Sequence, residues 1–239
     1  MSAQLLEMLK REMPIRISEI SLRMIRMSRT GLILVDLVNG FCTVGMGNLA
    51  PKKFDASIAD MVDTNVRLAR LFALRGRPIW VFRDEHDPAI PEPPYPPHCI
   101  KGSGEELLVP ELMWLNEYPK ATVTGKRCIN GFIGAISDQG NLLIDWVNRH
   151  RLVYLVVAGI CTDICDADLV CSLLSARNHQ MMPSLKDVIV YVPGTATYNL
   201  TREEALSSGL PEYAAHPADV TAYMGLYTMA SRGAILIYD

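Results

Sequence analysis

The sequence lacks the features that mark membrane proteins and nucleic-acid-binding proteins. Its apolar stretch Tyr154–Ile160 is far shorter than the ~20 apolar residues that a membrane-spanning helix needs. Lys and Arg number 23 against 26 Asp and Glu, and the resulting net charge of −3 provides no general basic surface for nucleic acid. We therefore expect neither a membrane nor a nucleic acid as partner.

Cysteine is present, but not in the pattern of a secreted disulfide framework. Only 6 cysteines occur in 239 residues, and three of them, Cys161, Cys165 and Cys171, lie in one short stretch. Residues 1–29 carry acidic and basic side chains throughout and lack the apolar segment and cleavage site of a signal peptide. We therefore expect reduced thiols and a cytoplasmic protein.

The composition that remains is that of a folded globular domain. Hydrophobic residues make up 49% of the chain and charged residues 21%, which is typical of such domains. We expect a single domain over 29–239, preceded by a helical extension over 1–28 with one or two helices around Pro14. Apolar runs predict strands at 30–36, 78–83, 121–124, 152–158, 188–192 and 234–238. Amphipathic patterns predict helices at 56–75, 141–150, 165–177 and 212–230.

This alternation of strands and helices indicates an α/β fold with a doubly wound, mostly parallel sheet and helices on both faces. Ligands of such sheets bind beyond the carboxyl ends of the strands. Asp36, Asp84 and the stretch Gly159–Cys165 follow three predicted strands, and Lys126 follows a weaker fourth. We therefore expect an acid, a lysine, a cysteine and a metal-binding loop at one edge of the sheet.

Cys165 lies where a buried strand turns into a helix. Unpaired N–H groups at a helix N-terminus favour a thiolate and can hold an oxyanion, which predicts a lowered thiol pKa and a nucleophile. The alternative is a small buried apolar residue, the usual role of a free cysteine. Asp36 is placed either to accept the thiol proton or to cap nearby amides. Lys126 either keeps that acid ionised or is a solvated loop residue.

Histidines and carboxylates are concentrated in and just before the long proline-rich loop 87–104. The residues concerned are Asp84, His86, Glu92 and His98. Two imidazoles with one or two carboxylates suit a divalent metal such as zinc, iron or manganese; polar loop residues without a metal are the alternative. Three other histidines are expected to be surface or structural residues: His150, His179 and His216.

Five motifs occur along the chain in a fixed order: VDLVNGFCTVGMGNLAP, DEHDP…PEPPYPPHC, GKRCINGFIGA, VVAGICTDIC and SARNH. Together they resemble the nicotinamidases of the isochorismatase-like hydrolase superfamily, in the plant-type branch, from about residue 30 onward. The resemblance implies a Rossmann-type, isochorismatase-like fold. It also implies hydrolysis of nicotinamide to nicotinate and ammonia through a cysteine thioester, a reaction of NAD salvage.

The resemblance assigns a role to each residue of the active site. It makes Asp36, Lys126 and Cys165 the catalytic triad, and the backbone N–H groups of Cys161 and Cys165 the oxyanion site. It implies a cis peptide bond between Ile160 and Cys161. Family members often self-associate, so a homo-oligomer is expected.

The resemblance also implies a metal ion and a wall for the substrate ring. One divalent ion is expected, zinc first, with iron or manganese as alternatives. Its implied ligands are Asp84, His86, Glu92 and His98, where Glu92 replaces a histidine of many relatives. Phe41 and Tyr95 match positions that flank the substrate.

One departure from the family pattern and two other functions stay open. Asp166 stands where relatives often have an apolar residue, and it either raises the pKa of the neighbouring thiol or only charges the first helical turn. An amidase acting on another small amide would share the triad, and a lapsed enzyme could serve as a binding module. An isochorismate-type hydrolase is disfavoured, because those enzymes lack the nucleophile that Cys165 provides.

Overall fold

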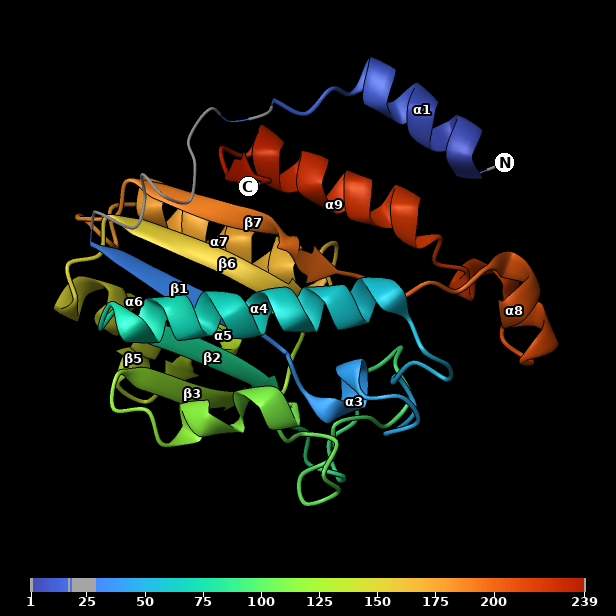
Figure 1. The fold of residues 1–239 in the computed structure, drawn as a ribbon, viewed down its shortest axis with the longest axis horizontal. Coiled ribbons are helices and arrows are strands. Elements are labelled where there is room, and N and C mark those ends of the chain that lie inside the picture. Colours follow the sequence, from blue (N-terminus) through green and yellow to red (C-terminus); the bar gives the residue numbers. More distant parts are fainter. Residues whose placement is uncertain (1, 17, 19–28, 239) are drawn as a thin grey trace.

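The computed structural model describes residues 2–16, 18 and 29–238, and it is built around a six-stranded parallel sheet. The strand order is β3-β2-β1-β6-β7-β8 (Figure 1). The strands are β1 (Thr30–Val35), β2 (Ile79–Asp84), β3 (Ala121–Lys126), β6 (Tyr154–Ile160), β7 (Asp187–Ala196) and β8 (Ile235–Ile237). A separate antiparallel pair is formed by β4 (Ile136–Ser137) and β5 (Gly140–Asn141). The predicted α/β class is confirmed.

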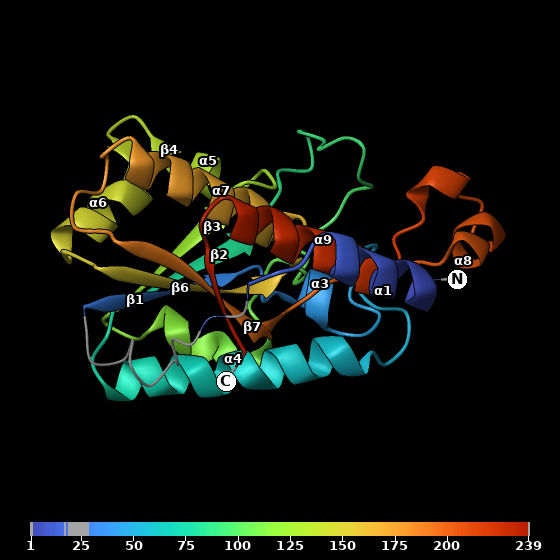
Figure 2. The same ribbon diagram turned by 90° about the horizontal axis from the view of Figure 1, so that it is seen from above.

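Helices cover both faces of this sheet, as Figure 2 shows. On one face lie α4 (Ala56–Leu74) and the 3-10 helix η1 (Pro110–Asn116), whose apolar side chains share one buried cluster with β1 and β2. On the other face lie α5 (Gly131–Gly134), α6 (Leu142–Arg149), α7 (Cys165–Asn178) and α9 (Ala218–Ser231). The doubly wound arrangement is therefore confirmed. Among the described residues, none of the helices is long and apolar enough to cross a membrane.

The sequence placed most of these elements within a few residues, but the helix predicted at 212–230 begins too early. The structure has a 3-10 helix η2 (Glu212–Ala214) and starts α9 only after Pro217. Proline has no N–H to donate and therefore ends or begins a helix rather than continuing it. The sequence did not predict the 3-10 helix η1 or three short α-helices, which are α3 (Asn39–Cys42), α5 and α8 (Arg202–Ser207).

The N-terminal helix α1 (Ser2–Glu12) packs on α9, and the Tyr223 hydroxyl donates to the Met13 carbonyl at 2.8 Å. A helix before Pro14 is therefore confirmed. The second helix expected around residues 20–25 lies outside the described residues. The division between an extension and a domain at residue 28 stays a prediction.

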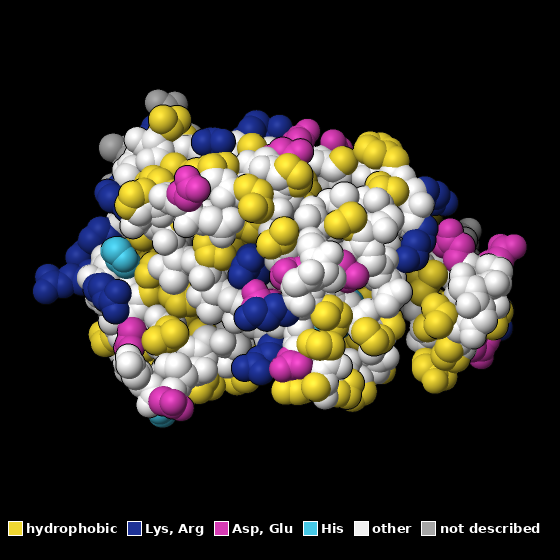
Figure 3. Space-filling view, turned by 90° about the horizontal axis from the view of Figure 1, so that it is seen from below, with side chains coloured by type: hydrophobic (Ala, Val, Ile, Leu, Met, Phe, Trp, Pro, Cys, Tyr) yellow, Lys and Arg dark blue, Asp and Glu magenta, His cyan; other side chains and the backbone are white. Residues whose placement is uncertain are grey.

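An arm between β7 and α9 extends beyond the end of the sheet and carries α8 and η2 (Figure 1). An ion pair between Arg202 and Glu212 joins its two halves. Leu206, Leu210 and Tyr213 are exposed on it. Figure 3 shows apolar side chains gathered on this arm, at the far right of the molecule. The base of this arm lies next to the edge of the sheet at which the predicted site residues gather.

The ends of β1 and β6 approach each other so closely that only glycine fits between them. A Cβ at Gly159, whose φ is +151°, would lie 2.1 Å from the Val35 carbonyl oxygen. The following residue of β1, Asp36, has a φ of +54°, which an aspartate tolerates better than most residues. This contact brings Asp36 next to the turn that leads into α7.

Candidate active site

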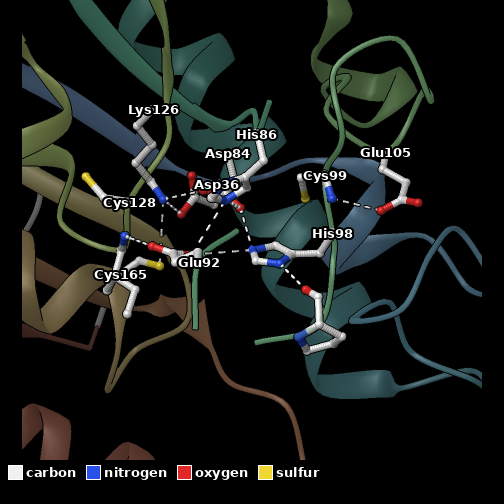
Figure 4. Close-up of polar contacts among 12 residues, drawn as sticks. Asp36, Asp84, His86, Glu92, His98, Cys99, Glu105, Lys126, Cys128 and Cys165 are labelled. Carbon is white, nitrogen blue, oxygen red and sulfur yellow. Dashed lines mark hydrogen bonds and ion pairs between the residues drawn. The ribbon is translucent and has the colours of Figure 1, made fainter. Parts of the chain in front are cut away.

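Four of the predicted site residues meet at the carboxyl edge of the sheet, as expected (Figure 4). Asp36 follows β1, Asp84 ends β2, and Lys126 ends β3 directly opposite Asp84. Cys165 is the first residue of α7, after the turn that follows β6. All four are buried, so their charges interact through a medium that screens them weakly.

Lys126 is the centre of this group. Its Nζ lies 2.9 Å from Asp36 Oδ2, 2.9 Å from Asp84 Oδ1 and 4.0 Å from Cys165 Sγ. Although burial lowers the pKa of Lys126, the surrounding Asp36, Cys165 and Asp84 raise it well above its usual value. Lys126 is therefore a permanent buried cation, and the alternative of a solvated loop lysine is wrong.

The pKa values of the two carboxylates beside Lys126 are shifted in opposite directions. Burial raises the pKa of Asp36 to about 6, against the lowering effect of Lys126. Burial by itself would also raise the pKa of Asp84, but Lys126 and the hydrogen bonds from His86 and His98 hold that pKa below its usual range. Asp84 is thus ionised throughout, while Asp36 is a base whose pKa lies close to neutral pH, as proton transfer requires.

The pKa of the Cys165 thiol differs from the prediction. Burial raises it well above its usual value, and the negative charge of Asp36 adds to this effect, although Lys126 opposes it. The position at a helix N-terminus does not outweigh burial beside two carboxylates, so the expected lowered pKa is wrong. In the free protein Cys165 is a thiol, and its proton has to leave during the attack.

The turn before Cys165 keeps two backbone N–H groups available. The Cys161 carbonyl accepts hydrogen bonds from the N–H groups of Ile164 and Asp166, each at 3.1 Å. Within the described part of the chain, the N–H groups of Cys161 and Cys165 donate to no backbone carbonyl. The Ile160–Cys161 peptide bond is cis, as the resemblance implied. Both N–H groups remain free to bind an oxyanion.

The expected metal ligands Asp84, His86 and His98 form a compact buried cluster whose ligand atoms lie within 4.8 Å of one another. Asp84 Oδ2 is 3.0 Å from Nε2 of His86 and 3.0 Å from Nε2 of His98. His98 Nδ1 donates to the Pro96 carbonyl at 2.8 Å, so Nε2 is the ring nitrogen that would give its lone pair to a metal ion in place of a proton. One carboxylate and two imidazoles fit a borderline divalent ion.

Glu92 lies beside this cluster but is partly engaged elsewhere. Its Oε2 is 3.5 Å from His86 Nε2 and 3.7 Å from His98 Nε2, while its Oε1 accepts the Ile129 N–H at 2.9 Å. Glu92 therefore joins the ligand loop to the segment that follows Lys126. Direct ligation by Glu92 stays a prediction.

Two aromatic rings, those of Phe41 and Tyr95, lie next to the ring of His98. The ring centroids of Phe41 and His98 are 5.7 Å apart, and those of Tyr95 and His98 are 6.0 Å apart. Phe41 belongs to α3. Burial raises the pKa of Tyr95, and the neighbouring Cys165 adds to this effect. Both rings thus lie beside the metal-ligand cluster, and their role as walls for the substrate ring stays a prediction.

Sequence reasoning gave no role at the site to two residues that contact its loops. Glu105 Oε2 accepts the N–H of Cys99 at 2.8 Å and so fixes the backbone next to His98 (Figure 4). His216 was expected to be surface or structural, but it forms an ion pair of 2.7 Å with Asp163 in the turn before Cys165. Because 53 residues separate the two, no local pattern could have revealed the pair. His150 and His179 are exposed, as predicted.

Asp166, the departure from the family pattern, is fully buried. Among the described residues its carboxyl oxygens have no hydrogen-bond partner. Burial raises its pKa well above the usual value, and Asp36 and Asp163 add to this effect. Burial therefore favours the protonated form of Asp166, which speaks against a role in charging the first turn of α7.

Comparison with known proteins identifies the family of the chain and finds solved structures with the same fold. The isochorismatase domain model matches residues 30–219. Nicotinamidase 1 of Arabidopsis thaliana is 45% identical over 232 residues, which cover 97% of this chain and 94% of that protein.

Solved structures of the same fold include a nicotinamidase of Bacillus subtilis, with a TM-score of 0.64 and 22% identity, covering 87% of this chain and 99% of that one. The N-carbamoylsarcosine amidase of Thermoplasma acidophilum gives a TM-score of 0.63 and 21% identity, covering 88% and 96%. At these identities the two structures show the fold alone.

Proposed function

The chain belongs to the isochorismatase family, and we propose that it is a nicotinamidase, an amidohydrolase that converts nicotinamide to nicotinate and ammonia in NAD salvage. Its similarity to a plant nicotinamidase over nearly its whole length supports this substrate. The observation that carries the chemistry is the buried group in which Lys126 lies 2.9 Å from Asp36 and 4.0 Å from Cys165.

The first half of the reaction forms a thioester. Asp36, ionised above pH about 6, takes the proton of the Cys165 thiol as the sulfur attacks the carboxamide carbon. The C–S bond forms and the carbonyl π electrons move to oxygen, where the N–H groups of Cys161 and Cys165 stabilise the negative charge. Lys126 stabilises the developing thiolate charge as the proton leaves.

The second half releases both products. Asp36 returns its proton to the leaving nitrogen, the C–N bond breaks, and ammonia departs. A water molecule then gives a proton to Asp36 and attacks the thioester carbon; the C–S bond breaks, nicotinate forms, and the proton returns to Cys165. Asp36 therefore acts as base, acid and base again, for which a pKa close to the working pH is suited.

Asp84, His86 and His98 are the residues that would hold the divalent ion, zinc first, with Glu92 as the fourth ligand. When bound, the ion supplies a Lewis-acidic position that can hold the pyridine nitrogen of the substrate. Phe41 and Tyr95 then flank the ring and orient its carboxamide toward Cys165. Asp84 touches both the metal site and Lys126, so the two halves of the site share one carboxylate.

The test is an ammonia assay of the purified protein with nicotinamide, combined with elemental analysis. We expect turnover and one bound divalent ion. Cys165→Ala should lower turnover by at least about a thousandfold while the protein stays folded, because the covalent nucleophile is lost. Cys161→Ala is the matched control and should act mildly, since only the backbone of Cys161 takes part. A Cys165→Ala variant with a tenth of wild-type activity would reject the mechanism.

The alternative is an amidase for another small amide, which the shared fold of N-carbamoylsarcosine amidase illustrates. Turnover of such amides with none of nicotinamide would favour it. The intact triad disfavours a lapsed enzyme. A homo-oligomer and a cytoplasmic location stay predictions, and light scattering of the purified protein tests the first of them.

A further inference from the structure

A side-chain contact between His216 and Asp163 holds the turn that presents both oxyanion N–H groups. Asp163 lies in the middle of this turn, two residues from Cys161 and two residues from Cys165. Its Oδ2 accepts a hydrogen bond from His216 Nε2 at 2.7 Å, and the two side chains are each only 12% exposed. The mechanism above uses neither residue.

Both ring nitrogens of His216 face acceptors. Nε2 donates to the Asp163 carboxylate, and Nδ1 donates to the Tyr198 carbonyl at 2.8 Å. Because neither partner can donate in return, both nitrogens carry a proton and the ring is an imidazolium. Although burial lowers the pKa of His216, Asp163 raises it above its usual value. The contact is thus a charge-assisted pair in a mostly dry position.

His216 is itself fixed in place. Its ring stacks on Tyr198 with centroids 4.0 Å apart and an interplanar angle of 13°. Its backbone pairs with that of Leu200 through two hydrogen bonds of 2.7 and 2.9 Å, which close the base of the arm. Pro217, the next residue, is the N-cap of α9. The imidazolium therefore projects from a rigid support.

From a second side, helix α9 presses on the same turn through its backbone. A Cβ at Gly225 would lie 2.5 Å from the Asp163 Cα, so only glycine permits this approach. Asp163 is consequently held between the backbone of α9 and the ring of His216. These two contacts therefore restrict the movement of its neighbours Cys161 and Cys165.

We propose that His216 is a positioning residue of the amidase site, which holds the Cys161–Cys165 turn through Asp163 so that the two N–H groups stay aimed at the oxyanion. This role rests on the proposed function. It predicts a loss of transition-state stabilisation rather than of substrate binding. Removing one oxyanion donor outright costs about 10²- to 10³-fold in kcat, and a loosened donor should cost less.

The test measures kcat and KM separately in variants of His216 and Asp163. His216→Phe keeps a ring to stack on Tyr198 but loses both hydrogen bonds; we expect kcat to fall about 10- to 100-fold with KM changed less than threefold. In Asp163→Ala kcat should fall by the same factor. The double variant should be no slower than either single variant, because the two residues form one contact. His179→Phe, at an exposed histidine, is the matched control.

Rescue by a conservative variant separates positioning from general damage to the fold. In Asp163→Asn the amide N–H can donate to an unprotonated Nε2 while Nδ1 still donates to Tyr198. This variant should recover most of the kcat that Asp163→Ala loses. A merely structural role of the charge pair would leave Asp163→Asn as slow as Asp163→Ala, and that result would overturn the proposal.

A measurement without substrate keeps this test separate from that of the proposed function. Amide hydrogen exchange of residues 160–168 should become at least about tenfold faster in His216→Phe than in the wild type. If His216→Phe does not fold, Asp163→Ala serves instead, since it leaves the His216 ring stacked on Tyr198 and hydrogen-bonded to the Tyr198 carbonyl. Unchanged exchange together with a kcat within twofold of wild type rejects the inference. A wild type that releases no ammonia rejects the proposed function, while the exchange still decides whether His216 holds the turn.

Discussion

Lys126 controls the charges of the site, because its Nζ lies 2.9 Å from a carboxylate oxygen of Asp36 and 2.9 Å from one of Asp84. One ammonium between two carboxylates leaves a net negative group around the buried Cys165. Burial, together with this negative charge, raises the thiol pKa although the residue starts a helix. Proton transfer to Asp36 during the attack is therefore a requirement of the electrostatics.

The acid limb of the pH–rate profile should report Asp36. Below pH about 6 its carboxyl is protonated and cannot take the thiol proton, so kcat/KM should fall toward tenfold per pH unit. Lys126 lowers the pKa of Asp36, and Lys126→Met should therefore move this limb to higher pH. Lys186→Met, at an exposed lysine, is the control that should leave the limb in place. An unmoved limb in Lys126→Met would remove that lysine from the proton transfer.

Among the elements, the contact between β1 and β6 sets the distance between the base and the nucleophile. Gly159→Ala would place a Cβ 2.1 Å from the Val35 carbonyl, and we expect it to lower the free energy of unfolding by about 3 kcal/mol or more. Gly140→Ala is the matched control: it also has a positive φ, +107°, but meets no atom within 4 Å. It should cost only about 1 kcal/mol. Urea unfolding measures both, and equal costs would mean that the clash is relieved.

The loop that follows β2 should decide substrate choice. If an ion bound by this loop coordinates the pyridine nitrogen, kcat/KM for nicotinamide should exceed that for benzamide, which lacks this nitrogen. A contact worth a few kcal/mol corresponds to about a hundredfold or more, since ~1.4 kcal/mol is tenfold. His98→Ala should lose both the ion and nicotinamide turnover, because its Nε2 belongs to the cluster. His179→Ala is the control. Equal rates on the two amides, or an active metal-free protein, would favour the general-amidase alternative.

The whole molecule should be stabilised by the ion, because the ligand cluster draws on β2 and on the loop after it and exists only when the chain is folded. An ion present at about 100 times its dissociation constant adds about 2.7 kcal/mol. For a chain of this size each kcal/mol is worth roughly 2–4 °C in Tm. Chelation should thus lower the Tm by about 5–10 °C, and added zinc should restore it. His98→Ala should show no response to the chelator; a response there would place the ion elsewhere.

The sequence by itself determined the fold class and the list of candidate residues. Buried parallel strands are continuous apolar runs, and strand ends carry the functional side chains, so Asp36, Asp84 and Lys126 could be placed at one edge before any contact was known. The roles of single residues came from the resemblance, whose motifs are local in the chain. The start of α9 was missed because the pattern continued through Pro217.

Only the tertiary structure decided the properties that depend on distance and burial. The raised pKa values of Cys165 and Asp166 and the near-neutral pKa of Asp36 follow from what surrounds each group in space. The pairing of His216 with Asp163 joins residues 53 positions apart. Periodicity records which face of an element is buried, whereas solvation and ion pairing are set by side chains that other elements bring to the same place.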